Sequence, residues 1–64
     1  MTIRLSLAGD SAKHYGGVKE FLRAQAIQQM VNRDVVVTTE KGSEIRFPWR
    51  DITSFTARYD ATGP

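Results

Sequence analysis

Residues 35–49 read Val-Val-Val-Thr-Thr-Glu-Lys-Gly-Ser-Glu-Ile-Arg-Phe-Pro-Trp, and this stretch decides the fold. β-Branched side chains dominate Val35–Thr39, which predicts a strand because such side chains fit a pleated surface. Gly42 follows in the connection, where a tight turn between two strands needs a positive φ. Glu44–Trp49 predicts the return strand, and Pro48 places it at a sheet edge or at its own end, since proline donates no ladder hydrogen bond. The stretch therefore predicts a β-hairpin.

Two further strands are expected at the ends of the chain. Thr2–Leu7 alternates apolar and polar residues, which is typical of a strand with one buried face. Ile52–Tyr59 alternates in the same way and predicts the last strand. The apolar residues that share a face are Ile3, Leu5 and Leu7 in the first strand, and Phe55, Ala57 and Tyr59 in the last.

Between the first strand and the hairpin, the composition predicts a helix. Val18–Val31 is rich in strong helix formers such as Leu, Ala, Gln, Lys and Glu. The apolar residues at four-residue spacing are Val18, Leu22, Ala26 and Met30. Residues 11–17 are interpreted as a loop, because Gly16 and Gly17 would stop any helical turn that begins at Asp10 or Ser11.

These elements predict a single α+β domain over residues 1–64. One helix would pack on a small, mainly antiparallel sheet of about four strands, in the order strand, helix, strand, strand, strand. The first strand would pair with the last or lie at an edge. Residues 60–64 are expected to form a frayed tail.

Composition excludes several classes of protein. The 64 residues are 41% hydrophobic, carry a formal net charge of +2, and include one histidine and no cysteine. A disulfide scaffold, a cysteine-ligated zinc site and a thiol nucleophile are thereby excluded. No apolar run approaches the length of a membrane span, and residues 1–8 lack the hydrophobic stretch of a secretory signal. We therefore expect a cytoplasmic protein, in its own cell or in a host, without membrane partners.

Catalysis is not predicted. His14 is the only imidazole, and no acidic residue is expected to orient it. The seven carboxylates are scattered singly at turns and strand ends, so no acid–base pair is predicted to face a cleft. We expect no enzyme activity, no cofactor and no metal.

Positive charge suggests a site for an anion. Glycines next to a helix N-terminus would let the backbone approach a phosphate, and an aromatic ring would stack on a base. Arginines on exposed strand faces would add contacts to a nucleotide or nucleic acid. The alternatives are turn glycines, a tyrosine at the core edge and ordinary surface ion pairs. The candidate residues are Lys13, His14, Tyr15, Gly16, Gly17, Lys19, Arg4, Arg46 and Arg50.

A second group of residues suggests a protein interface. Trp49 follows Pro48 at a strand end, and tryptophan is enriched at binding hot spots. Val36 lies on the opposite strand face from Val35 and Val37, so it would be exposed if these two are core. Neutral amides are cheaper to bury at an interface than ions. The glutamines considered are Gln25, Gln28 and Gln29, with an ordinary exposed helix face as the alternative.

The sequence thus predicts a small non-catalytic binding protein. A chain of this size has a thin core, which favours a homo-oligomer. The expected ligand is anionic: a nucleotide-like small molecule or nucleic acid. The alternative is a protein–protein module or inhibitor that docks on a larger partner through Phe47-Pro48-Trp49. Its size would also suit a phage or plasmid accessory protein.

Overall fold

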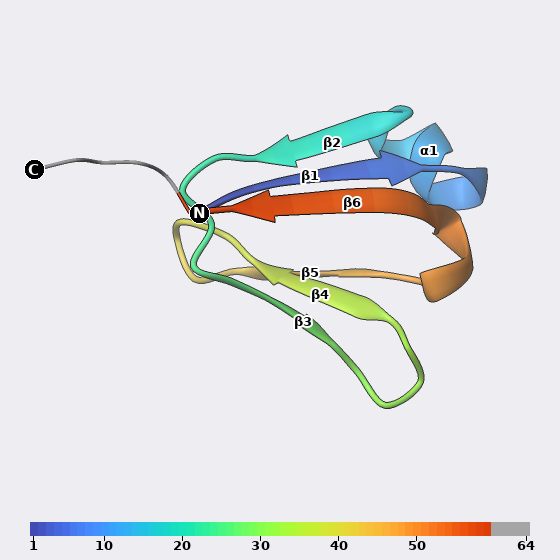
Figure 1. Cartoon of the computed structure of the whole chain (residues 1–64). Helices are drawn as coiled ribbons and strands as arrows, with labels where there is room; N and C mark the ends of the chain where they lie inside the picture. Colours follow the sequence, from blue (N-terminus) through green and yellow to red (C-terminus); the bar gives the residue numbers. More distant parts are fainter. Residues whose placement is uncertain (60–64) are drawn as a thin grey trace, which may run out of the picture.

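The computed structural model describes residues 1–59 of the chain. Six strands, one α-helix and one 3-10 turn follow one another with short connections (Figure 1). In chain order they are β1 (Thr2–Leu7), α1 (Gly9–Tyr15), β2 (Val18–Phe21), β3 (Ala26–Gln29), β4 (Val35–Thr38), β5 (Glu44–Phe47), η1 (Trp49–Asp51) and β6 (Ile52–Arg58).

The strands form two antiparallel sheets of three strands each. Their orders are β2-β1-β6 and β3-β4-β5, and all neighbours are antiparallel. Figure 1 shows β1 between β2 and β6, with the second sheet beneath them and α1 at one end. The α+β class is confirmed, whereas the single four-stranded sheet is wrong. The pairing of the first strand with the last is confirmed, although β1 is central rather than at an edge.

The helix predicted over Val18–Val31 is wrong, because this segment forms β2 and β3 joined by a bend. The supposed core row is mostly on the surface: Val18 is 47% exposed and Leu22 is 63% exposed. The buried residues are Phe21 and Ala24 instead. Helix propensity is a weak preference that tertiary pairing overrides, and here the segment completes two sheets.

The bend between β2 and β3 carries the chain from one sheet to the other. The backbone N–H of Ala24 donates to the Met1 carbonyl at 2.7 Å, which continues the first sheet. The N–H of the next residue, Gln25, donates to the Thr38 carbonyl at 2.8 Å and opens the second sheet. A positive φ of 58° at Arg23 makes the corner between them. One continuous segment therefore fixes how the two sheets pack.

The only α-helix within residues 1–59 lies where a loop was expected. Its N-cap residue, Ala8, provides no side-chain cap, but Asp51 supplies one from η1. The Asp51 Oδ2 accepts hydrogen bonds from the Ser11 N–H at 3.2 Å and from the Ser11 hydroxyl at 2.8 Å. Gly16, with φ of 91°, ends the helix. The prediction that the glycines stop a helical turn is therefore confirmed. The cap from Asp51, 40 residues away in the sequence, explains why residues Gly9–Tyr15 are helical.

The core lies between the sheets. Its largest fully buried side chains are those of Ile3, Leu5, Val37 and Phe47. Phe47 contacts the rings of Tyr15 and Phe21, with centroids 5.2 and 6.1 Å away. The expectation that Phe47 belongs to the core is confirmed.

The hairpin prediction is confirmed in its main features. β4 and β5 are antiparallel neighbours, and Gly42 has a φ of 88° in their connection. The return strand ends at Phe47, directly before Pro48. Trp49 therefore begins η1 instead of sharing a strand face with Ile45 and Phe47, as the sequence suggested.

No helix within residues 1–59 has the length and apolarity needed to cross a membrane. The predicted frayed tail, residues 60–64, lies outside the described residues.

The contact between Gly9 and Asp51 gives a test of the α1 cap. A Cβ on Gly9 would lie 2.8 Å from the Asp51 Oδ1, and Gly9 has a φ of 61°. We expect Gly9→Ala to lower the free energy of unfolding by about 1–3 kcal/mol, through backbone strain and displacement of the cap. Thermal unfolding followed by circular dichroism measures the loss. Gly17→Ala is the matched control, because no atom lies within 4 Å of that added methyl group. Equal melting temperatures for the two variants would contradict the cap.

Candidate functional site

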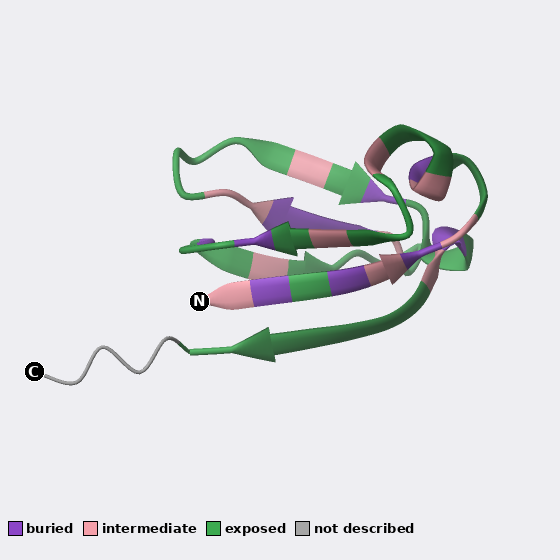
Figure 2. Cartoon of the chain, turned by 90° about the horizontal axis from the view of Figure 1, so that it is seen from above, coloured by how far each residue is buried: buried purple, intermediate pink, exposed green. Residues whose placement is uncertain are grey.

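β6 is the strand whose environment does not match its sequence. It pairs with β1 along one edge, and no strand within residues 1–59 pairs with its other edge. Its register places Phe55 opposite Leu5 and Ala57 opposite Ile3, so these residues share the sheet face that builds the core. Leu5 is nevertheless fully buried, whereas Phe55 is 52% exposed. Figure 2 shows β6 exposed along almost its whole length beside β1. The inner face of β6 is only partly covered within residues 1–59: Ile52 packs against the core, whereas Phe55 stays half exposed.

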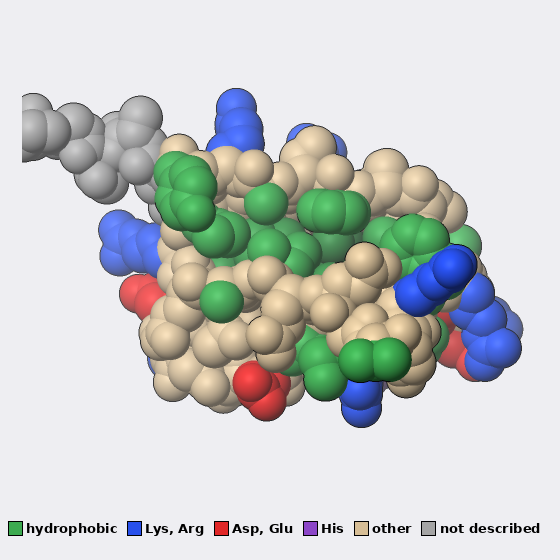
Figure 3. Space-filling model, turned by 60° about the horizontal axis from the view of Figure 1, so that its bottom comes forward, with side chains coloured by type: hydrophobic (Ala, Val, Ile, Leu, Met, Phe, Trp, Pro, Cys, Tyr) green, Lys and Arg blue, Asp and Glu red, His purple; other side chains and the backbone are tan. Residues whose placement is uncertain are grey.

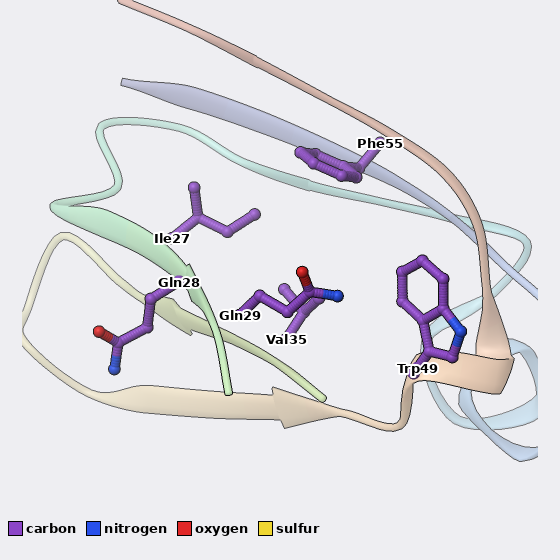
Figure 4. A pocket seen from close by; sticks show the side chains of 6 residues that line it. All are labelled: Ile27, Gln28, Gln29, Val35, Trp49 and Phe55. Atoms are coloured by element: carbon purple, nitrogen blue, oxygen red, sulfur yellow. The ribbon is translucent and has the colours of Figure 1, made fainter. Parts of the chain in front are cut away.

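The exposed part of this face forms one side of a hollow between the two sheets. Its volume is about 220 Å³. In Figure 4, the rings of Phe55 and Trp49 approach it from β6 and η1, while Ile27 and Val35 line it from the second sheet. The residues around this hollow are Ile27, Gln28, Gln29, Val35, Trp49 and Phe55. Gln28 points away from the two rings in the same view.

The apolar surface continues beyond this hollow along β6. A second hollow of about 250 Å³ shares Ile27 with the first and also contains Ala57 and Tyr59. Figure 3 shows hydrophobic side chains gathered in a hollowed band across this side of the molecule. We refer to this surface as the apolar groove. Its apolar residues are Met1, Ile27, Val35, Trp49, Phe55, Ala57 and Tyr59.

The apolar groove carries little charge. None of the six residues around its first hollow carries an ionisable side chain. Arg58 lines the second hollow at the end of β6. An exposed apolar surface rimmed by polar groups is typical of a protein interface. A phosphate in the first hollow would lose its hydration without gaining a cation.

The Asp34 side chain anchors the backbone of Trp49. The Asp34 Oδ1 accepts a hydrogen bond from the Trp49 N–H at 3.3 Å. The other carboxylate oxygen accepts one from the Asn32 side-chain amide at 3.2 Å and lies 3.4 Å from the Arg46 Nε. Trp49 is 44% exposed although its backbone is anchored.

In the structure, the residues predicted to bind an anion lie in several separate places. Gly16 and Gly17 follow the C-terminus of α1, so the expectation that they precede a helix N-terminus is wrong. Tyr15 packs against Phe47, which fits a role at the core edge. Lys13 and His14 occupy the last turn of α1. Lys19 lies on β2 with its ammonium 5.3 Å from the centre of the Phe21 ring.

The three candidate arginines also fail to form one cluster. Arg4 lines a hollow on the outer face of the first sheet, together with Glu20 and Arg58. Arg46 pairs with Asp34 on the second sheet. Arg50 belongs to η1 and shares a shallow hollow with Asp34. Anion binding through these residues stays a prediction that the structure does not test.

The residues predicted for an interface divide into two groups. Trp49, Gln28 and Gln29 line the apolar groove, although the two glutamines lie on β3 rather than on a helix. Gln25 is near the bend, where its amide donates to the Glu40 carbonyl at 3.1 Å. The expected exposure of Val36 is wrong, since only 7% of this residue is exposed.

Sequence reasoning did not place Phe55 and Ile27 at the apolar groove, which they line in the structure. The alternation of Phe55, Ala57 and Tyr59 indicated a strand with an apolar face, and this part was correct. The same alternation does not reveal whether another element covers that face. Ile27 was hidden within the wrong helix prediction.

Within residues 1–59, no group of three or more His, Cys, Asp or Glu side chains is arranged to hold a metal ion. Searches against protein-family models, curated protein sequences and solved structures found no match. The apolar groove is therefore interpreted from its own geometry.

The Asp34 contacts predict that Trp49 depends on this carboxylate. We expect Asp34→Ala to lower the free energy of unfolding by about 0.5–1.5 kcal/mol, because the Trp49 N–H loses a hydrogen bond and Arg46 loses a partly exposed ion pair. The tryptophan emission maximum should shift to the red as the indole becomes more mobile and better hydrated. Fluorescence spectra and chemical denaturation measure both effects. Glu40→Gln is the control, since it breaks only the exposed ion pair with Arg23. An unchanged emission spectrum in Asp34→Ala would contradict the anchor.

Proposed function

We propose that the chain is a non-catalytic protein-interaction module that binds an extended polypeptide segment in the apolar groove. The observation that carries the proposal is the inner face of β6, where Phe55 is 52% exposed beside a fully buried Leu5. The register with β1 directs this face toward the core, so a missing neighbour explains its exposure better than a solvent-facing role does.

The backbone of β6 supports the same function. A sheet edge presents unpaired N–H and C=O groups, and an added strand satisfies them with regular hydrogen bonds. Alternate side chains of that strand would point into the hollow between Phe55, Trp49 and Ile27. The proposed ligand is therefore a polypeptide in extended conformation, with apolar residues at every second position.

The anionic ligand expected from the sequence is the second candidate. Its best support is the hollow of about 320 Å³ on the outer face of the first sheet, lined by Thr2, Arg4, Glu20, Thr56 and Arg58. Two guanidinium groups and two hydroxyl-bearing side chains suit a phosphate. The Glu20 carboxylate opposes this use, so we rank it second. The cytoplasmic location stays a prediction that fits the absence of cysteine.

Peptide selection tests the proposed function. The purified protein is used to select from a library of random peptides long enough to span β6, and selected peptides are measured by fluorescence anisotropy. We expect sequences with alternating apolar residues, and affinity that changes little with salt, because the first hollow contains no charge. Trp49→Ala should weaken binding about 30-fold, the effect of removing an interface hot spot.

Arg4→Ala is the matched control, because this side chain lies on the outer face of β1. It should leave the binding of such peptides unchanged. Selection of acidic peptides whose binding disappears in Arg4→Ala and at high salt would overturn the proposal in favour of the anionic ligand. Failure of the monomeric protein to select any peptide whose binding depends on Trp49 would also overturn it.

A further inference from the structure

We infer that the segment bound beside β6 is the β6 strand of a second copy of this chain, paired antiparallel about a two-fold axis at Thr56. This inference rests on the proposed function, because it names the occupant of the same edge. The two copies would join their first sheets into one sheet of six strands, β2-β1-β6-β6-β1-β2. Their apolar grooves would meet on the same side of that sheet.

The four sheet edges differ in how they are protected. Natural proteins block unwanted strand pairing with charged side chains, proline and very short strands. β2 has four residues and carries Lys19 and Glu20. β5 has four residues, carries Glu44 and Arg46, and is followed by Pro48.

The edges on the groove side lack these charges. β3 is neutral but has only four residues. β6 has seven residues, and its residues from Ile52 to Ala57 include neither a charge nor a proline. The edge that offers the longest neutral backbone is therefore the one beside the partly exposed apolar face.

The sequence of β6 is complementary to itself in one register. The shift of pairing between Ser6 and Leu7 leaves Thr53 as an extra residue, so the regular part of the strand is Ser54–Arg58. Its centre is Thr56, which would face the Thr56 of the second copy. Threonine pairs across antiparallel strands are favourable.

The remaining pairs in this register also fit. On the groove face, Phe55 would lie opposite the small Ala57 of the second copy, which leaves room for the ring beside Trp49. On the outer face, Arg58 would lie opposite Ser54, so the two Arg58 side chains stand at opposite ends of the interface. No like charges meet along the shared edge. An unrelated peptide would need to supply this match from outside, whereas a second copy contains it.

Analytical ultracentrifugation of the full chain over a range of concentrations tests the inference. We expect a reversible monomer–dimer equilibrium, with tryptophan emission shifting to the blue as dimers form. Substitutions at Ser54 then test the register, because each places a new charge opposite Arg58 of the other copy. Ser54→Lys should weaken the dimer about fivefold, and Ser54→Glu should strengthen it by a similar factor, since each change creates two cross-strand charge pairs.

The double variant Ser54→Lys/Arg58→Glu is the decisive measurement. It places opposite charges across both 54–58 pairs, as Ser54→Glu does, and should therefore dimerise about fivefold more tightly than the wild type, whereas Ser54→Lys alone weakens the dimer. The i and i+4 positions of one strand lie too far apart for the two side chains to pair within a copy. Thermal unfolding at high dilution checks that each variant folds as a monomer.

Three outcomes separate this inference from the proposed function. A monomer at all concentrations that still binds peptides through Trp49 would overturn the inference and leave the proposed function standing. A dimer whose constant is unaffected by the charge of residue 54 would overturn the inferred register. A monomer that binds no peptide would overturn both.

Discussion

The pairing of β1 with β6 is the constraint on which the rest of the structure depends. β1 supplies Ile3 and Leu5, which are fully buried, and its register with β6 fixes the direction of every β6 side chain. Side chains alternate along a strand, so Phe55 could point to the opposite sheet face only if the register of β6 shifted by one residue. Such a shift would also move Ala57 to that face. The exposure of Phe55 is thus imposed by the fold and is not a rotamer choice at the surface.

Two aspartates stabilise the segment that leads into β6. Asp34 anchors the backbone of Trp49 at the start of η1, and Asp51 at its end caps α1 through Ser11. Both carboxylates join elements that are distant in sequence, so η1 is fixed to the hairpin on one side and to the helix on the other. These contacts fix the backbone from which the Trp49 side chain extends toward the groove. One end of the groove is formed by the short turn η1, which the carboxylates of Asp34 and Asp51 connect to the rest of the structure.

The sequence predicted the parts of the fold that depend on local chemistry. The alternation in Thr2–Leu7 and the β-branched run at Val35 indicated strands, because a pleated surface suits these side chains wherever they lie. Helix α1 was missed because its cap comes from Asp51, 40 residues away. The strands β2 and β3 were missed because their pairing partners, rather than their composition, determine their conformation. The groove could be anticipated only at Trp49, since exposure of Phe55 depends on which elements fail to cover it.

The distribution of charge among the sheet edges favours the proposed binding groove over a poorly packed core. If incomplete burial were merely the consequence of small size, the protective charges would be expected at the longest open edge, where unwanted pairing is most dangerous. They lie instead on the short strands β2 and β5, away from the groove. β6 is the longest of the four edge strands, its residues Ile52–Ala57 are uncharged, and its inner face is apolar. An unprotected strand edge beside two exposed aromatic rings lowers the solubility of the unbound protein. A strand that pairs with this edge and covers the rings removes this disadvantage.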